Sequence, residues 1–150
     1  MPNFVYAAFN VTGPSPDIEH FCCKMFKTIS ENGVDCHDAL GGPKIILDYA
    51  EVLPMPPEWE DGIEAWGVKA WGTKWCGFDV EHRMTEDGGL WFQFTSAWSF
   101  PEDAFKAIAA DFPSLVFDGS AYEESHEFEF VGEFNGANDW GPGEIEWIEI

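Results

Sequence analysis

The sequence predicts an α+β two-layer sandwich, in which two helices pack on one face of a mainly antiparallel sheet. Several short segments alternate apolar and polar residues as half-buried strands do, whereas two other segments repeat apolar residues at helical spacing. The two kinds of segment are interspersed along the chain, as in α+β domains. With 150 residues, 45% of them hydrophobic and 17% aromatic, the chain is large enough to bury one hydrophobic core.

The first strand and the first helix occupy the N-terminal part of the chain. Residues 3–11, NFVYAAFNV, have the β-branched and aromatic composition of a strand, and TGPSP after them is typical of a turn. An apolar stripe then runs from Ile18 to Ile29 at three- and four-residue spacing. With Ser15 as its N-cap and an Asn-Gly pair as its stop signal, we expect a helix over 16–31.

The middle of the chain predicts one strand, a connection and a hairpin. Residues 44–53, KIILDYAEVL, favour a strand that the proline-rich PMPPEW ends. Residues 66–75, WGVKAWGTKW, then form a connection. Strict alternation over 78–84 and again over 90–95, on either side of EDGG, predicts a β-hairpin with one face buried.

The last part of the chain predicts a second helix followed by strands. Ser99 and Glu102 have the spacing of a capping box, and apolar residues at helical spacing predict a helix over 101–112, closed by Pro113. The runs SLVF, HEFEFVGEF and EIEWIEI favour strands, the last two separated by a glycine-rich loop.

The order of these elements is closest to the split βαβ topology of the ferredoxin-like fold. We therefore expect residues 1–150 to form a single ferredoxin-like domain, with an acidic C-terminal extension over about 120–150.

Five short segments resemble a known family. MPNFV at the start, VLPMPPE after the second expected strand, WGTKW at 71–75, FQFTSAWSFP ending at residue 101 and DFPSLVF at 111–117 together resemble the YubB-type ferredoxin-like proteins of plasmids and phages. The resemblance implies a ferredoxin-like α+β domain without an iron–sulfur cluster, encoded on a mobile element, and it implies no activity. Cys76 stands where family members usually carry Asn after WGTKW.

No catalytic or metal-binding pattern is found in the sequence. It lacks a Gly-x-Ser-x-Gly elbow, a phosphate-binding glycine loop, a His-Glu-x-x-His pair and a calcium loop. Cys22 and Cys23 are adjacent, so they point about 100° apart on a helix, and one metal ion cannot easily bind both. We therefore expect no enzymatic activity, no metal and no cofactor, and buried or incidental thiols in a reducing compartment.

The tryptophan-rich repeat over 66–75 has two interpretations. In the first, Trp66, Trp71 and Trp75 hold a connection against the sheet, Gly67 and Gly72 permit turns, and the lysines pair with nearby carboxylates. In the second, Lys74 and the indoles of Trp66, Trp71 and Trp75 bind a small ligand or a peptide by stacking. The first interpretation is favoured, and the second is kept as the alternative function.

The charge of the chain points to one kind of partner. The net charge is −21, and the part after Lys106 has no basic residue and carries −11. Such a surface disfavours direct contact with nucleic acid or an anionic membrane. Glutamates spaced two apart on strands form fixed rows, and several neighbouring rows together could imitate the charge of duplex DNA.

We therefore expect a non-enzymatic mobile-element protein that acts as a nucleic-acid mimic or anti-defence inhibitor. Its partner would be a basic nucleic-acid-binding protein, such as a host defence nuclease, with tryptophans as apolar anchors beside the charge. The residues expected to bind the partner are Glu123, Glu124, Glu127, Glu129, Glu133, Asp139, Trp140, Glu144, Glu146, Trp147 and Glu149. Because the sequence has neither a long apolar run nor a secretory signal, a bacterial cytoplasmic location is expected.

Overall fold

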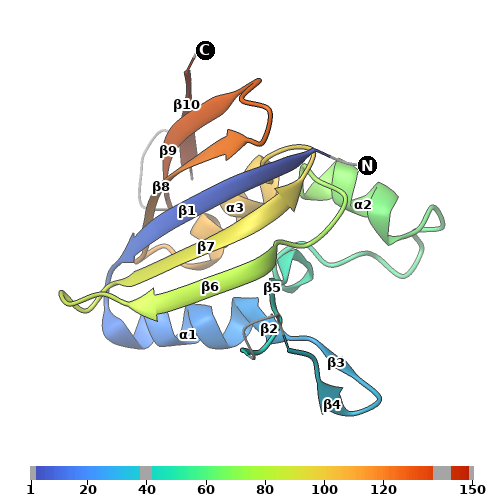
Figure 1. Ribbon diagram of the computed structural model, residues 1–150, viewed down its shortest axis with the longest axis horizontal. Helices are drawn as coiled ribbons and strands as arrows, with labels where there is room; N and C mark the ends of the chain where they lie inside the picture. Colours follow the sequence, from blue (N-terminus) through green and yellow to red (C-terminus); the bar gives the residue numbers. More distant parts are fainter. Residues whose placement is uncertain (1–2, 38–41, 137–142, 149–150) are drawn as a thin grey trace.

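The main sheet has six strands, and four of them with two helices form the ferredoxin-like core. The computed structural model describes residues 3–37, 42–136 and 143–148. The strand order is β10-β9-β8-β1-β7-β6, with every neighbouring pair antiparallel (Figure 1). The core elements are β1 (Phe4–Thr12), α1 (Ser15–Met25), β6 (Phe78–Met84), β7 (Leu90–Ala97), α3 (Glu102–Asp111) and β8 (Val116–Glu123).

The connections in this core are those of two interlocked split βαβ units. Strand β1 continues through α1 to β6, and β7 lies between these two strands in the sheet. Strand β7 likewise continues through α3 to β8, with β1 between them. Because each neighbouring pair is antiparallel, the strands within each unit are parallel. The predicted ferredoxin-like α+β class is confirmed.

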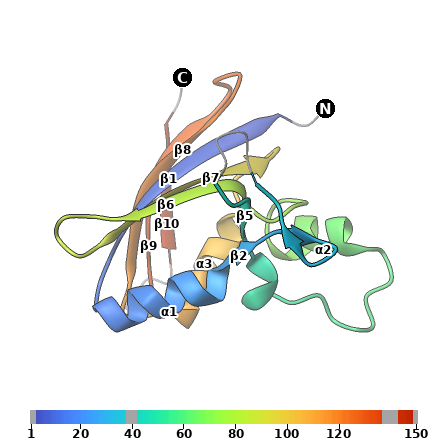
Figure 2. The same cartoon turned by 60° about the horizontal axis from the view of Figure 1, so that its bottom comes forward.

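Both core helices cover the same face of the sheet, which we call the inner face (Figure 2). Ile18, Phe21 and Met25 of α1 and Phe105 of α3 are fully buried. Phe9 lies at the centre, its ring centroid 4.8 Å from that of Phe105. Aromatic rings pack around it from β7, α3 and β9, so one continuous core stabilises the domain.

The predicted C-terminal extension is built into the main sheet. Strand β9 (Glu129–Asn135) pairs with β8, and β10 (Gly143–Ile148) pairs with β9. Phe130 and Phe134 of β9 are buried in the core. The last part of the chain therefore contributes to the stability of the domain as well as to its charge.

The first helix is shorter than predicted. It ends at Met25, because Phe26–Thr28 (β2) leave the helix to pair with Ile45–Leu47 (β5) in a separate two-stranded sheet. Pro14, not Ser15, is the N-cap, and no side chain caps the helix. The prediction was too long because the helical spacing of apolar residues continues to Ile29, whereas pairing with β5 ends the helix at Met25.

The segment between α1 and β6 also differs from the prediction. The expected strand over 44–53 is reduced to β5 and followed by a 3-10 helix, η1 (Tyr49–Glu51), while β3 (Ser30–Glu31) and β4 (Val34–Asp35) form a small hairpin. Residues expected to be an irregular connection form α2 (Ile63–Ala70). We call residues 26–77 the insertion, because they separate two consecutive elements of the ferredoxin-like core.

The predicted hairpin is confirmed, with one correction to its burial. Leu90, Phe92 and Phe94 of β7 are buried as expected. On the edge strand β6 only Val80 is buried; Met84 is 56% exposed, and His82 stacks on Phe26 at 4.7 Å. These two residues pair with inner-face positions but lie at the margin of the helical layer, where little covers them.

The predicted capping box of the second core helix is wrong. The N-cap of α3 is Pro101, and the helix has no side-chain cap. The Ser99 hydroxyl donates instead to the carbonyl of Gly72 in the insertion, and Glu102 forms an ion pair with Lys106. The Ser99 hydroxyl, which the local spacing predicted to cap the helix, is instead hydrogen-bonded to a distant residue.

Candidate functional site

The face of the sheet opposite the helices, here called the outer face, carries a row of directly opposed acidic residues. The register pairs Glu133 of β9 with Asp118 of β8 on one side and with Glu144 of β10 on the other. Asp118 and Glu133 are both exposed. Neighbouring strands are about 4.8 Å apart, and like charges placed directly opposite one another destabilise a sheet. The sheet therefore holds acidic groups close together at a cost to its own stability.

Positive charge is nearly absent from this part of the sheet. All seven basic residues lie in the described part of the chain, and of these Arg83 alone is on a strand of the main sheet. Arg83 lies on β6, the edge strand furthest from β9 and β10, with its guanidinium 4.6 Å from the ring centroid of Trp91. The potential over β8 to β10 is therefore negative, and no basic residue on these strands offsets it.

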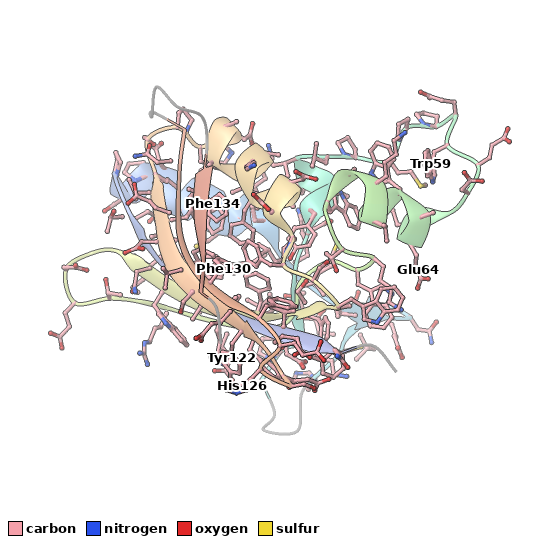
Figure 3. The ribbon with its side chains drawn as sticks, turned by 90° about the horizontal axis from the view of Figure 1, so that it is seen from above. Trp59, Glu64, Tyr122, His126, Phe130 and Phe134 are labelled. Atoms are coloured by element: carbon pink, nitrogen blue, oxygen red, sulfur yellow. The ribbon has the colours of Figure 1, made fainter. Side chains whose placement is uncertain are left out.

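An exposed aromatic patch lies on the same face of the sheet as the acidic row, four residues further along β8 from Asp118. Tyr6 of β1 lies directly opposite Tyr122 of β8, with ring centroids 5.5 Å apart, and the two are 37% and 44% exposed. The His126 ring is 5.4 Å from that of Tyr122. In Figure 3, Tyr122 and His126 lie on the side of the sheet away from Phe130 and Phe134. These rings provide apolar surface on the outer face next to Glu129, which lies opposite Tyr122.

The turn between β8 and β9 contains two of the predicted partner-binding residues in structural roles. Glu123 is 1% exposed, and its carboxylate accepts hydrogen bonds from the backbone N–H groups of Ser125 and Glu127. These bonds, that from Glu127 first, lower the pKa of Glu123 below its ordinary value. Glu124 is exposed, but its carboxylate accepts from the backbone N–H of Phe4. The prediction that Glu123 contacts a partner is therefore wrong.

The other predicted partner-binding residues fall into three groups. Glu127 is exposed in the turn, and Glu129 is half-buried on β9. Strand β10 carries Glu144, Glu146 and Trp147, with Glu146 opposite Val131 and Trp147 opposite Phe130. Asp139, Trp140 and Glu149 lie outside the described residues.

Two tryptophans of the repeat are structural. The indole N–H groups of Trp66 and Trp71 both donate to the carbonyl of Leu53, at 3.1 and 2.9 Å. Trp71 is buried and packs edge-on against Tyr49. Since Trp71 is buried, it is not available to a ligand, and the alternative site is reduced to Trp66, which is half-buried, Lys74 and Trp75.

The two glycines of the repeat are needed for different structural reasons. Gly72 has a φ of +89°, which favours glycine in a turn, as predicted. Gly67 lies within α2, where a Cβ would come 2.5 Å from the carbonyl oxygen of Thr73. The expectation that Gly67 permits a turn is therefore wrong; it permits the helix to approach the loop that follows it.

The lysines of the repeat contact aromatic rings. Within the residues that the structure describes, neither Lys69 nor Lys74 forms an ion pair, contrary to the expectation. The Lys69 ammonium lies 5.0 Å from the ring centroid of Trp59. The Lys74 ammonium lies 4.2 Å from the ring centroid of Trp75 and 4.1 Å from that of Trp98. Sequence reasoning missed Trp98, which comes from the end of β7.

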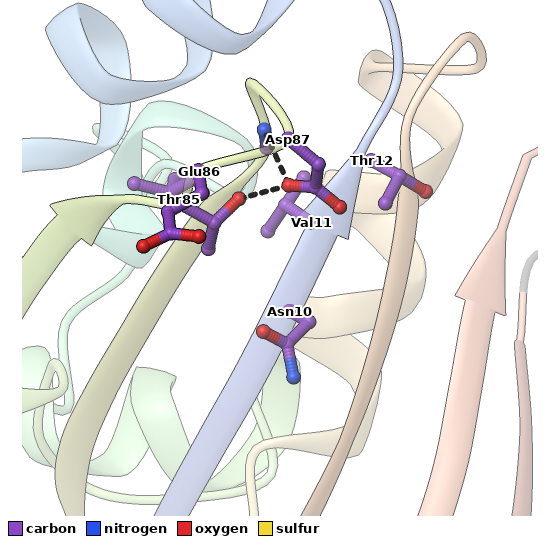
Figure 4. Close-up of a pocket in the computed structure, with 8 residues that line it drawn as sticks. Asn10, Val11, Thr12, Thr85, Glu86 and Asp87 are labelled. Atoms are coloured by element: carbon purple, nitrogen blue, oxygen red, sulfur yellow. Dashed lines mark hydrogen bonds between the residues drawn. The ribbon is translucent and has the colours of Figure 1, made fainter.

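The acidic residue in a hollow at the β6–β7 turn has a structural explanation. The hollow measures about 480 Å³ and is lined by Asn10, Thr12, Glu86 and Asp87 among others (Figure 4). The Asp87 carboxylate accepts from the Thr85 hydroxyl and from the backbone N–H of Gly89, and these bonds lower its pKa. Asp87 therefore closes the turn between the two strands, and its hydrogen bonds are made within that turn.

The thiols have the properties of buried or incidental cysteines. Burial raises the pKa of Cys22 and of Cys76 to about 11 each, whereas Cys23 is exposed. The Cys76 sulfur lies 3.6 Å from a carboxylate oxygen of Asp48. In the described part of the chain, no three His, Cys, Asp or Glu residues are grouped as metal ligands. The absence of a metal stays a prediction.

Fold and surface together define a ferredoxin-like α+β domain whose outer sheet face is acidic. Residues 70–139 match a family model described as the ferredoxin-like domain in Api92-like protein. The matched range includes strands β6 to β9 and helix α3, which contain both Asp118 and Glu133. No curated protein and no solved structure matches the chain. No helix among the described residues is long and apolar enough to span a membrane.

Sequence reasoning missed three residues of the outer face. Asp118 and Tyr122 lie in the part of β8 beyond SLVF, and Tyr6 lies on β1. Exposed and buried positions alternate from 116 to 123 in the structure, but in the sequence Gly119 and Ser120 interrupt the apolar pattern that would have extended the strand. The pairing of Tyr6 with Tyr122 had no signal in the sequence, because it depends on sheet order.

Proposed function

We propose that this protein is a YubB-type protein of a plasmid or phage that acts, without catalysing a reaction, in the bacterial cytoplasm. Its acidic outer face occupies the basic nucleic-acid-binding site of a host protein, such as a defence nuclease or a regulator. The observation that supports this function is the register that places Asp118, Glu133 and Glu144 opposite one another on three neighbouring strands. An unfavourable arrangement of like charges becomes favourable when a basic partner neutralises it.

The density of the charges supports mimicry of nucleic acid. Alternate residues on one strand are about 6.8 Å apart, so one strand is far sparser in charge than duplex DNA, which has one charge per about 1.7 Å. Across strands, the acidic residues recur at about 4.8 Å, with Glu129 further along β9. A patch of several strands can thus hold several Lys or Arg side chains at once, as a phosphate backbone does.

The aromatic patch gives the proposed interface its apolar anchor. Interfaces gain most of their binding energy from a few aromatic and arginine residues surrounded by a polar rim. Tyr6 and Tyr122 are exposed, adjacent and placed on strands whose inner faces are fixed by the core. We therefore assign Tyr122 to slow the dissociation of the partner and the acidic residues to speed its association.

The test compares two variants with the same change in charge. The face variant combines Asp118→Asn, Glu129→Gln and Glu133→Gln; the control combines Glu58→Gln, Glu60→Gln and Asp61→Asn, all exposed in the insertion. A host protein retained by the immobilised parent and by the control, released by duplex DNA and lost with the face variant would support the proposal. At low salt, this host protein should associate with the face variant about tenfold or more slowly than with the parent.

Two results would contradict the proposed function. Equal retention of the same host proteins by the face variant and the control would show that only net charge matters. Retained proteins that duplex DNA does not compete away would exclude mimicry of nucleic acid.

A further inference from the structure

We propose that Trp75 and Trp98 form a clamp for a basic side chain of a partner protein, and that Lys74 of the same chain occupies this clamp in the free protein. The inference does not rest on the acidic outer face. It starts from the position of the Lys74 ammonium, 4.2 and 4.1 Å from two indole centroids. A cation over the face of a tryptophan is attracted by the ring quadrupole, and here two faces share one cation.

The two indoles are accessible. Trp75 is 36% exposed and Trp98 is 52% exposed, although tryptophan is among the side chains that gain most from burial. The other tryptophans of the repeat, Trp66 and Trp71, are fixed to Leu53 and serve packing. Exposed indoles beside buried ones indicate that this pair has a role besides packing.

The indole of Trp75 and the backbone of Trp98 are held in place before any ligand binds. The Trp75 indole N–H donates to the Glu64 carboxylate at 2.8 Å, and the Trp98 backbone N–H donates to Asn3 at 2.7 Å. Their two loops are joined by the Thr73 hydroxyl, which donates to Ala97 at 2.6 Å. A preformed site loses less conformational entropy when it binds a ligand.

The backbone of Trp98 adds an independent observation. Its φ is +68°, a left-handed conformation that is unusual for a bulky residue. Such outliers persist where the surrounding structure enforces them, and they cluster at functional sites. In this fold, the conformation lets the chain turn directly after buried Ala97 and present the Trp98 ring to Lys74.

The resident lysine identifies the chemistry of the ligand. Lys74 forms no ion pair with any described carboxylate, although the chain has 28 acidic residues. The clamp thus holds a cation through aromatic faces, and the net charge of −21 favours cationic over anionic ligands. The occupant we assign is an arginine or lysine side chain, and arginine stacks better on aromatic rings.

An adjoining apolar hollow gives the incoming side chain further surface. It measures about 300 Å³ and is lined by Ile46, Trp75, Cys76 and Phe78. The partner residue next to the basic one would place an apolar side chain there. Lys74 has a flexible four-carbon stem, so it can leave the clamp without a change in the backbone.

The test measures binding of small cations without any partner protein, so it is independent of the acidic-face experiment. Tetramethylammonium chloride and the peptide acetyl-Gly-Arg-Gly-amide are titrated while NMR follows the indole N–H signals of Trp75 and Trp98. Sodium chloride at equal ionic strength is the reference. In Lys74→Gln both cations should give saturable shifts, with an affinity about three- to tenfold higher than in the parent, because the competing ammonium is gone.

Two further variants make the result specific. Lys69→Gln removes a lysine that lies over Trp59, so it has the same change in charge and should behave as the parent. Trp98→Leu keeps an apolar side chain without a π face, so in the Lys74→Gln background it should abolish saturation; Trp98→Ala checks this result with a smaller residue. Shifts in Lys74→Gln no larger than those with sodium chloride, or saturation that survives both Trp98 changes, would overturn the proposal.

Discussion

The inner and outer faces of the main sheet are built from alternate residues of the same strands, yet they have opposite properties. On β1, Phe9 is fully buried among aromatic rings, whereas Tyr6 is exposed. On β9, Phe130 and Phe134 belong to the core, whereas Glu133 faces another acid across the strand gap. One backbone therefore carries a face that stabilises the fold and a face whose charges oppose it.

The comparison shows why an unfavourable surface can be maintained. Removing a buried phenylalanine costs about 3–5 kcal/mol, whereas an opposed pair of like charges costs about 0.2–1 kcal/mol. The packing of the inner face therefore exceeds the repulsion on the outer face by several fold. This difference allows the outer face to be shaped for binding.

The largest expected effect is on the inner face. Phe9→Ala should lower the free energy of unfolding by about 3–5 kcal/mol, because it leaves a cavity at the centre of the core. Tyr6→Ala, three residues earlier on the same strand, should cost about 1 kcal/mol or less. Urea denaturation followed by circular dichroism measures both. Equal losses would mean that the two faces of β1 do not differ as described.

The next effect concerns Glu123, the glutamate that is buried at the end of β8. The pKa of Glu123 is lowered, so its ionised form stabilises the folded state above its unfolded pKa, and this stabilisation is lost as the pH falls through the folded pKa. Glu123→Gln should therefore melt below the parent at pH 7, and the gap should narrow below about pH 4.3. The exposed Glu86→Gln is the control for the loss of one carboxylate.

A smaller effect of opposite sign is expected on the acidic row. Asp118→Asn combined with Glu133→Gln removes an opposed pair of like charges and should raise the free energy of unfolding by about 0.2–1 kcal/mol. The gain should shrink in 0.5 M salt, because salt screens exposed charges. Glu58→Gln with Glu60→Gln supplies the matched change in net charge. A loss of stability in the double face variant would show that the row is not repulsive.

The last prediction compares the buried and the exposed side of α1 and needs no substitution. Burial raises the pKa of Cys22 to about 11, from an ordinary value of 9.0, while Cys23 is exposed. At pH 8, Cys22 therefore forms about a hundredfold less of the reactive thiolate than a thiol with the ordinary pKa of 9.0 would. A thiol reagent followed by peptide mass spectrometry should label Cys23 first. Equal labelling rates under native conditions would place both thiols on the same side of α1.

The elements that the sequence predicted well are those set by local patterning. β-Branched and aromatic composition located β1, alternation of apolar and polar residues located the β6–β7 hairpin, and helical spacing located α3. The interspersed order of these elements was sufficient for the ferredoxin-like class. For the candidate site, the sequence indicated acidic strands after Lys106 and lysines beside tryptophans.

Other features were decided by contacts between segments distant in the chain. Helix α1 ends at Met25 because β2 pairs with β5, and α2 is held in place by the indole of Trp66, which donates to Leu53. The sequence pattern did not indicate these contacts. When only the neighbouring residues are considered, the glycines of the two Trp-Gly steps favour turns.

The sequence by itself determined the acidity of the last strands, the amphipathic elements and the fold class, because each follows from residue type and local period. Only the tertiary structure decided that Asp118 faces Glu133, that Glu123 is buried, and that Trp98 shares the Lys74 ammonium with Trp75. Strand register and loop approach join segments that are far apart in the chain, and local spacing carries no information about which segments meet.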